Sequence, residues 1–254
     1  MNTFKNRNIL ITGATSGLGK ELSIYLDQKV KSLICLGKTR NKIKSLRRIL
    51  KNKKNIYFDG DISKKHKLKN FLIFLKKVKN IDTIIHCMGG GLGIKSDFIS
   101  EKDFLKLLKV NLICQSEINN FLIKKMIKNK IAGNILHVSS VAALESTASI
   151  GYSCAKAALT VYSKKLAKAF IKNNIFVNTI ILGAFETNDN SFARLKKRNI
   201  KAYKKFKNTR LPRKKYAKAQ DVIPVVEFLI SKKSHMLSGT DVVTDFSESN
   251  SFRI

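Results

Sequence analysis

The chain has 254 residues, of which two are proline, none is tryptophan and few are acidic. No proline- or serine-rich linker interrupts it, so we expect one domain over residues 1–254 around a single core. No apolar run approaches membrane-spanning length, and the run before Gly13 is too short for the core of a signal peptide. We therefore expect a soluble, cytoplasmic protein that does not insert into a membrane.

Cysteine is scarce as well. The four cysteines, Cys35, Cys87, Cys114 and Cys154, lie far apart, form no Cys-x-x-Cys pair and have no histidine cluster beside them. This spacing predicts reduced thiols, with neither a metal site nor a disulfide.

Negative charge is the most pronounced shortage. Lys and Arg number 50 against 17 Asp and Glu, which gives a formal net charge of +33. Such an excess attracts phosphates, nucleic acid, acidic proteins or anionic membrane surfaces. The chain is also rich in Lys, Asn and Ile, so a biased overall composition is an equally good explanation of the charge.

Three glycines follow a short apolar run near the N-terminus. Residues 9–11 lead into Gly13, Gly17 and Gly19, and helical periodicity begins at about Lys20. The Gly-x-x-x-Gly-x-Gly spacing is related to the Gly-x-Gly-x-x-Gly dinucleotide motif. It predicts a strand, a tight turn and a helix whose first N–H groups face a pyrophosphate.

Apolar strands and helices alternate along the rest of the chain. We expect further strands at about 32–36, 55–58, 83–87, 134–138, 176–182 and 241–245. We expect helices between them, at about 40–51, 64–79, 101–129, 152–172 and 219–231. The pattern predicts a doubly wound α/β sheet of about seven parallel strands with helices on both faces. Ligands of such sheets bind beyond the carboxyl ends of the strands.

Basic residues follow the second expected strand. An acid about twenty residues after the glycines would bind the ribose 2′-hydroxyl of NAD(H), but this chain has Lys38 and Arg40 there. Cations at this place can pair with a 2′-phosphate, so the sequence favours NADP(H), with NAD(H) as the alternative. After the third strand, Asp61 is placed either to bind an adenine amino group or to cap the next helix.

Ser140 ends the fifth expected strand, and Tyr152 and Lys156 open the helix after it. Residues four apart share one face of a helix, so the ammonium can lie near the phenol. A nearby positive charge lowers a tyrosine pKa from its usual value of about 10. The motif therefore predicts a tyrosine that exchanges a proton near neutral pH.

Together, the glycine turn and the Tyr-x-x-x-Lys motif resemble the classical short-chain dehydrogenase/reductase family over about residues 6–245. The resemblance implies a Rossmann-type α/β fold. It implies a catalytic set made of Asn111, Ser140, Tyr152 and Lys156. It implies that the residues at the cofactor are Gly13, Thr15, Ser16, Gly17, Leu18, Gly19, Lys38, Arg40, Asp61, Ile62, Gly89, Tyr152, Lys156, Gly183, Phe185 and Thr187.

The resemblance also implies a reaction, the transfer of a hydride between nicotinamide and a carbonyl or secondary alcohol carbon. Tyr152 would be the general acid in reduction and the base in oxidation. Lys156 would bind the nicotinamide ribose and lower the tyrosine pKa. Ser140 would hydrogen-bond the substrate oxygen, and Asn111 would hold a water that links Lys156 to solvent.

The sequence departs from the family pattern after the fourth strand. The family commonly has Asn-Asn-Ala-Gly, where this chain has His86 to Gly89. We expect His86 to replace an asparagine as a hydrogen-bonding residue rather than to act in catalysis. Residues 86–91 and 144–146 resemble members from bacterial surface-polysaccharide pathways, and reductases of acyl-carrier-protein thioesters are the alternative.

A basic segment is expected to cover the substrate. Residues 184–218, called the basic segment below, correspond to the family's mobile substrate lid, and no acid occurs from Asn190 to Gln220. If this charge is functional, the substrate is anionic, such as a nucleotide-activated sugar or an acyl thioester on coenzyme A or acyl carrier protein. Apolar residues on more than one face of the two long helices predict a homodimer or homotetramer.

Two other functions are compatible with the same fold. A nucleic-acid-binding protein would use Tyr203, Phe206 and Tyr216 to stack bases among the lysines of the basic segment. A regulatory sensor would bind the cofactor without turnover. The Ser-Tyr-Lys set favours an enzyme over both, and a nucleic-acid partner is not expected.

Overall fold

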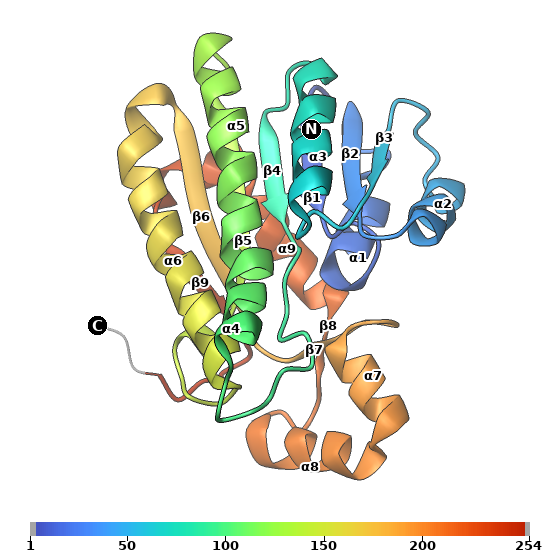
Figure 1. Cartoon of the computed structure of the whole chain (residues 1–254), viewed down its shortest axis with the longest axis vertical. Coiled ribbons are helices and arrows are strands. Elements are labelled where there is room, and N and C mark those ends of the chain that lie inside the picture. The colour runs from blue at the N-terminus through green and yellow to red at the C-terminus, as the bar shows by residue number, and fades with distance from the viewer. Residues whose placement is uncertain (1–3, 252–254) are drawn as a thin grey trace.

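A computed structural model describes residues 4–251 as a sheet between two layers of helices (Figure 1). The seven strands are all parallel. Their spatial order is β3 (Ile56–Asp59), β2 (Ser32–Gly37), β1 (Asn8–Thr12), β4 (Thr83–His86), β5 (Gly133–Ser140), β6 (Ile175–Leu182) and β9 (Asp241–Thr244). This confirms the predicted doubly wound sheet. The strand order reverses between β1 and β4, where such sheets bind their ligands.

Each face of the sheet has its own helices and its own core. Helices α1 (Gly17–Leu26), α2 (Arg40–Ile49) and α9 (Ala219–Leu229) cover one face. Helices α3 (Lys65–Lys77), α5 (Cys114–Lys128) and α6 (Ile150–Phe170) cover the other. Ile9 and Ile11 of β1 are buried in the first core and Leu10 in the second. Strands buried on both faces therefore read as continuous apolar runs, and each such side chain stabilises the fold by about 1.5–3 kcal/mol.

The helix predicted over 101–129 is interrupted. It consists of α4 (Glu101–Leu108), a π-helical turn (Lys109–Ile113) and α5. The Asn111 side chain lies inside this turn and donates from Nδ2 to the Leu107 carbonyl at 2.9 Å. Helix α1 also differs from its prediction, because it begins at Gly17, inside the glycine turn. Short 3-10 turns cover Val141–Ala143, Ile171–Asn173 and Lys232–Leu237.

The basic segment forms a small layer at the carboxyl ends of the strands, at the lower edge of Figure 1. It contains β7 (Phe185–Glu186), α7 (Ser191–Arg198), α8 (Ile200–Arg210) and β8 (Ala217–Lys218), and β7 pairs with β8. The buried rings of Tyr203 and Tyr216 stack with centroids 4.5 Å apart. These elements were not predicted, because the segment is held by aromatic side chains that lie far apart in the sequence.

No helix within residues 4–251 is long and apolar enough to cross a membrane. All four cysteines fall within this range, and they are free.

Two buried histidines lie on adjacent strands in a chain of hydrogen bonds. Thr12, His86 and His137 are register partners across β1, β4 and β5, and all three are buried. His86 Nε2 donates to Asn119 Oδ1 at 2.8 Å, and Asn119 Nδ2 donates to His137 Nε2 at 2.9 Å. His137 Nδ1 lies 2.6 Å from Ser163 Oγ. Each contact is satisfied with both imidazoles neutral, which confirms that His86 serves as a hydrogen-bonding residue.

This chain of hydrogen bonds predicts acid sensitivity. Burial lowers the pKa of His86 to about 4 and also lowers that of His137. Between pH 6.5 and 4 the unfolded histidines bind protons that the folded ones do not, so the free energy of unfolding falls as the pH falls. For His86 alone we expect a loss of about 2 kcal/mol between pH 7.5 and pH 5. Urea unfolding at both pH values measures it.

The control for this prediction is the exposed His66. His86→Asn should reduce the pH dependence of unfolding by the stated amount, and His66→Asn should leave it as in the wild type. An unchanged pH dependence in His86→Asn would contradict the assignment of the acid sensitivity to the buried pair.

Candidate active site

The glycine turn is packed tightly against the end of β4. A Cβ atom on Gly13 would lie 2.9 Å from the Met88 nitrogen, and one on Gly19 would lie 2.4 Å from the Gly13 carbonyl oxygen. Gly13 and Gly17 also have positive φ angles, of 70° and 53°. A side chain would clash at Gly13 and at Gly19 and would be strained at Gly17, so glycine lets the turn bring its backbone close to the carboxyl end of the sheet.

The side chains of the other predicted residues of this turn do not all face the ligand site. Thr15 is buried against Gly37, and the Leu18 side chain belongs to the core, so Leu18 can offer a ligand only its backbone. Ser16 precedes α1 without bonding to it through its side chain. Instead, the Gly17 N–H donates to Asp189 Oδ1 at 2.8 Å. Sequence reasoning missed Asp189, because 172 residues separate the two partners.

Two residues predicted to contact different parts of the cofactor contact each other. Lys38 Nζ lies 3.0 Å from Asp61 Oδ2. Asp61 Oδ1 accepts from Ser63 N and Oγ, so it also shapes the turn before α3. Burial alone would raise the pKa of Asp61, but hydrogen bonds from Ser63 and Lys38 leave it lowered. Arg40 is exposed at the start of α2, whereas the Ile62 side chain lies in the core.

Asn111 connects the π-helical turn to the loop after β4. Its Oδ1 accepts from Gly90 N at 2.8 Å, and its Nδ2 donates to the Gly90 carbonyl at 3.1 Å. A Cβ on Gly89 would lie 2.6 Å from Asn111 Oδ1 and 3.1 Å from Lys156 Nζ. Gly89 therefore lets Asn111 and Lys156 approach the same point of the backbone.

Ser140, Tyr152 and Lys156 lie together at the ends of β5 and α6. The side chains of Ser140 and Tyr152 are hydrogen-bonded. Lys156 is only 3% exposed, and its Nζ donates to the Val138 carbonyl at 2.7 Å and lies 5.8 Å from the centre of the Tyr152 ring. Burial lowers the pKa of Lys156 to about 8. The predicted catalytic residues thus form one cluster.

One expectation about this cluster is wrong. The pKa of Tyr152 is raised, because burial outweighs the hydrogen bond from Ser140. The expected lowering by Lys156 is not found, since the ammonium is directed to the Val138 carbonyl. Spacing along the helix predicted the proximity of the two residues but not the direction of the ammonium.

The loop after β6 offers a buried hydroxyl. Ser140 and Leu182 are register partners, so Gly183 follows directly beside the catalytic cluster. A Cβ on Gly183 would lie 2.6 Å from Asp245 Cβ, and Phe185 packs partly buried against the core. Thr187 is buried, and its Oγ1 has no hydrogen-bond partner among residues 4–251. This hydroxyl and the further donors of the Lys156 ammonium suit the phosphate and ribose groups of a nicotinamide dinucleotide.

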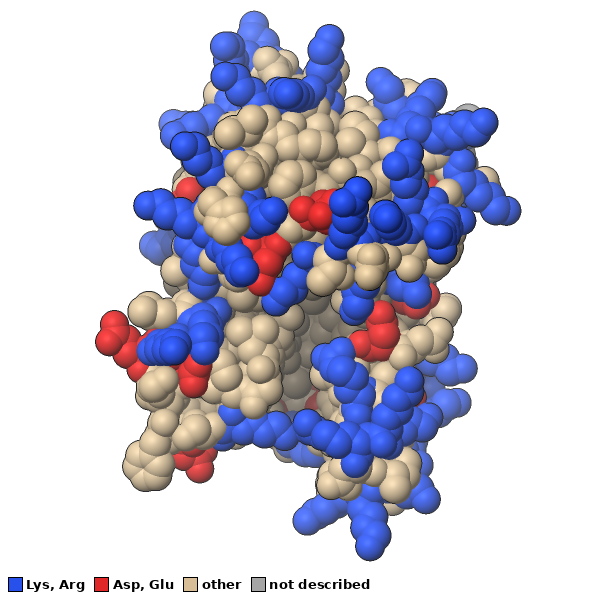
Figure 2. Space-filling model, turned by 45° about the vertical axis from the view of Figure 1, so that its right-hand side comes forward, with Lys and Arg blue, Asp and Glu red and all other residues tan. Residues whose placement is uncertain are grey.

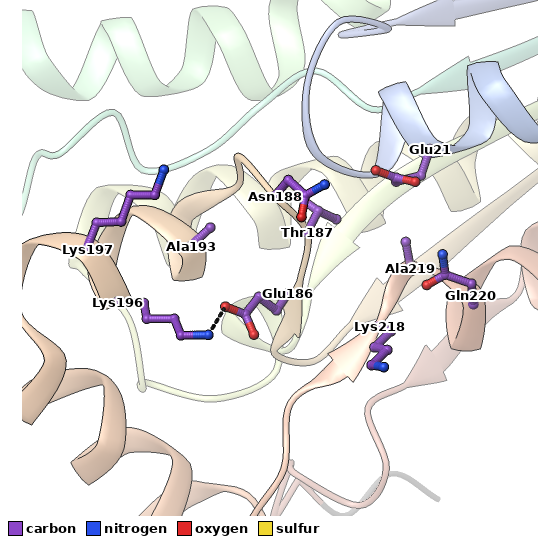
Figure 3. Close-up of a pocket in the computed structure, with 10 residues that line it drawn as sticks. All are labelled: Glu21, Glu186, Thr187, Asn188, Ala193, Lys196, Lys197, Lys218, Ala219 and Gln220. Carbon is purple, nitrogen blue, oxygen red and sulfur yellow. Dashed lines mark hydrogen bonds and ion pairs between the residues drawn. The ribbon is translucent and has the colours of Figure 1, made fainter.

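A pocket of about 580 Å³ lies between α1 and the basic segment (Figure 3). Its lining residues are Glu21, Glu186, Thr187, Asn188, Ala193, Lys196, Lys197, Lys218, Ala219 and Gln220. None of the four predicted catalytic residues lines it, and Lys196 pairs with Glu186 at 3.4 Å across it. The pocket therefore includes the loop that carries Thr187 but not the predicted catalytic residues.

Glu145 joins three segments near the catalytic cluster. Arg210, the last residue of α8, donates from Nη2 to Glu145 Oε2 at 2.7 Å. Ser249 Oγ and Asn250 N donate to the other carboxylate oxygen. Glu145 lies between β5 and α6, so its bonds connect this part of the chain with the basic segment and the C-terminal residues. The sequence gave no sign of these partners.

The aromatic residues required by the nucleic-acid hypothesis are not available for stacking. Tyr203 and Tyr216 are 8% and 7% exposed, and Phe206 packs against them. The Tyr203 hydroxyl donates to Glu186 Oε2 at 2.9 Å. A base-stacking surface needs exposed rings, so this hypothesis is not supported.

Comparisons with known proteins agree with this geometry. A family model described as short chain dehydrogenase matches residues 7–198. The 3-oxoacyl-(acyl-carrier-protein) reductase FabG of Buchnera aphidicola subsp. Schizaphis graminum is 30% identical over 94% of this chain and 95% of its own.

Two solved structures share the fold. The 4-hydroxyisoleucine dehydrogenase complexed with NADH has a TM-score of 0.86 and 24% identity, over 96% of this chain and 100% of the other. The L-sorbose reductase from Gluconobacter frateurii complexed with NADPH and L-sorbose has a TM-score of 0.88 and 20% identity, over 99% and 100%. The chain belongs to the short-chain dehydrogenase/reductase family and is an NAD(P)-dependent oxidoreductase.

Proposed function

We propose that this protein reduces the 3-oxo group of an acyl thioester with NADPH. The observation that carries the proposal is the cluster of Ser140, Tyr152 and Lys156, in which the tyrosine is hydrogen-bonded and the lysine is buried. The 30%-identical relative, whose name is 3-oxoacyl-(acyl-carrier-protein) reductase, supports the substrate class.

Each residue of the cluster has its own role in the proposed reaction. NADPH supplies the hydride when it is bound. Tyr152 donates its phenolic proton to the carbonyl oxygen, and Ser140 donates a hydrogen bond to the same oxygen. Lys156 binds the ribose hydroxyls through the donors that its bond to the Val138 carbonyl leaves free. Asn111 holds the loop at Gly90 and so keeps the neighbouring Gly89 against Lys156.

Lys38 and Arg40 support NADP(H) as the cofactor. Both are exposed at the end of β2 and the start of α2, and Lys38 already pairs with a carboxylate, Asp61. A 2′-phosphate is also an anionic oxygen group, like the Asp61 carboxylate, and it carries more negative charge. NAD(H) stays the alternative, since the Asp61 carboxylate can itself accept from a ribose hydroxyl.

The basic segment supports a phosphate-bearing substrate. Lys and Arg side chains are spread over the face shown in Figure 2 and gather in its lower part, where the basic segment lies. Helices α7 and α8 contain no acid, and Lys201, Lys204 and Lys205 are exposed. Thioesters on coenzyme A or on the phosphopantetheine of a carrier protein bear phosphate, which lysines attract.

We further propose that the protein is a homo-oligomer. Leu105 of α4 and Ile150 and Val161 of α6 are large apolar residues that are 50%, 46% and 63% exposed. A second copy of the chain would bury such side chains.

The first prediction of this function concerns Tyr152. Tyr152→Phe should lower kcat for acetoacetyl-coenzyme A reduction by at least about a hundredfold, because the proton donor is lost. NADPH affinity should stay within a factor of two of the wild type. Steady-state rates and fluorescence titration measure both quantities. Tyr57→Phe, on β3, is the control and should keep its rate; a Tyr152→Phe variant with near-normal kcat would contradict the assignment.

The second prediction concerns the cofactor. Lys38→Glu should weaken NADPH binding by about tenfold or more, because a carboxylate replaces the partner of the 2′-phosphate. NADH binding should change much less. Titration of both cofactors measures this ratio, and Lys42→Glu, exposed on α2, is the charge-matched control. Equal losses for the two cofactors would show that Lys38 does not contact the 2′-phosphate.

The third prediction concerns the basic segment. The double variant Lys204→Glu/Lys205→Glu should raise KM for acetoacetyl-coenzyme A by about tenfold, because two attractions become repulsions. Neither its kcat nor its KM for the uncharged ethyl acetoacetate should change. The control is Lys124→Glu/Lys128→Glu, which changes the net charge by the same amount. These two lysines are on α5 just before β5 begins, away from the carboxyl ends of the strands. If both double variants raise KM equally, the effect comes from the overall charge of the protein.

A further inference from the structure

We propose that Asp189 competes with the cofactor pyrophosphate for the first turn of α1 and so lowers the affinity of the enzyme for its cofactor. The inference rests on the proposed cofactor site. The inference adds to that site a residue, Asp189, that belongs neither to the glycine motif nor to the catalytic set.

The contact itself is direct. Helix α1 begins at Gly17, has no acid in its first turn and receives no side-chain bond from Ser16. The Gly17 N–H donates to Asp189 Oδ1 at 2.8 Å. A helix N-terminus carries a partial positive charge, and its N–H groups bind either a carboxylate or a phosphate. Asp189 thus holds an amide in the turn to which the family resemblance assigns the pyrophosphate.

Asp189 has a partly buried position that neighbouring bonds maintain. Arg194 Nη1 donates to the Asp189 backbone carbonyl at 2.6 Å. The next residue, Asn190, accepts from Ala193 N at 3.0 Å and donates to the Phe185 carbonyl at 2.6 Å. A Cβ on Gly17 would lie 3.7 Å from Asn190 Cβ. The start of α7 is therefore packed against the glycine turn, with the carboxylate directed at the amide.

No cation among the described residues pairs with the Asp189 carboxylate, although lysine and arginine outnumber acids 50 to 17. Its carboxylate is bonded to an uncharged backbone N–H, and Arg194 binds the backbone oxygen of Asp189 rather than the carboxylate.

Two anions cannot share this amide. A pyrophosphate that binds at Gly17 must displace the carboxylate or remain beside it, and either outcome weakens binding. Because Asp189 lies two residues after Thr187 and two before α7, its displacement would also move the start of α7. Cofactor affinity and the position of α7 are linked in this way.

The test compares ligands with and without a pyrophosphate. Asp189→Asn keeps the size of the side chain and removes its charge. It should lower Kd for NADPH and for ADP-ribose by about tenfold, because a charge-assisted bond becomes a neutral one. Adenosine 2′-monophosphate, which has no pyrophosphate, should bind equally to both proteins. Calorimetric titration measures all three ligands, and Glu117→Gln, exposed on α5, is the control that removes the same charge elsewhere.

Each outcome decides the proposal. A gain limited to the two pyrophosphate ligands and absent from Glu117→Gln supports it. If wild type binds NADPH and Asp189→Asn binds it equally or more weakly, the competition is excluded while the cofactor site stands. An equal gain for adenosine 2′-monophosphate overturns it as well, since the effect would then be one of net charge. If neither protein binds NADPH, the competition and the cofactor site fail together.

Discussion

The close contact between the glycine turn and the end of β4 determines where the rest of the site lies. With less than 3 Å available for a Cβ at Gly13 and at Gly19, the turn and the residues after β4 are held together through backbone atoms. The loop that follows is thereby directed across the carboxyl edge of the sheet. Gly89 lies on that loop and meets both Asn111 and Lys156. The proposed catalytic cluster therefore depends on a backbone contact that a larger residue at Gly13 would separate.

The sequence predicted well what depends on local pattern. Strand positions follow from apolar runs, and Gly13, Gly17 and Gly19 mark the turn because a side chain would clash or be strained there. It predicted less well what depends on distant partners. The π-helical turn at Asn111 accompanies bonds to Gly90, and the helices of the basic segment depend on the packing of Tyr203 against Tyr216. Such contacts have no counterpart in the periodicity of the chain.

The same limit explains the error about Tyr152. Helical spacing brings Lys156 near the phenol, but the direction of the ammonium depends on the Val138 carbonyl of the adjacent strand. A buried ammonium with one hydrogen bond has donors to spare, and ribose hydroxyls would satisfy them. We expect a dinucleotide bound to these donors to change both the burial of the phenol and the position of the ammonium, and with them the pKa of Tyr152.

The scarcity of acidic residues makes the few at the site informative. Asp61, Glu145, Asp189 and Glu248 are four of the 17 acids in the chain, and each binds a cation or a backbone N–H beside a predicted ligand-binding segment. A composition biased toward lysine accounts for a surface of positive charge. It does not account for carboxylates placed at the glycine turn and at the loop after β6. These contacts arrange the segments around the site, so the distribution of the negative charges carries more functional information than the excess of positive ones.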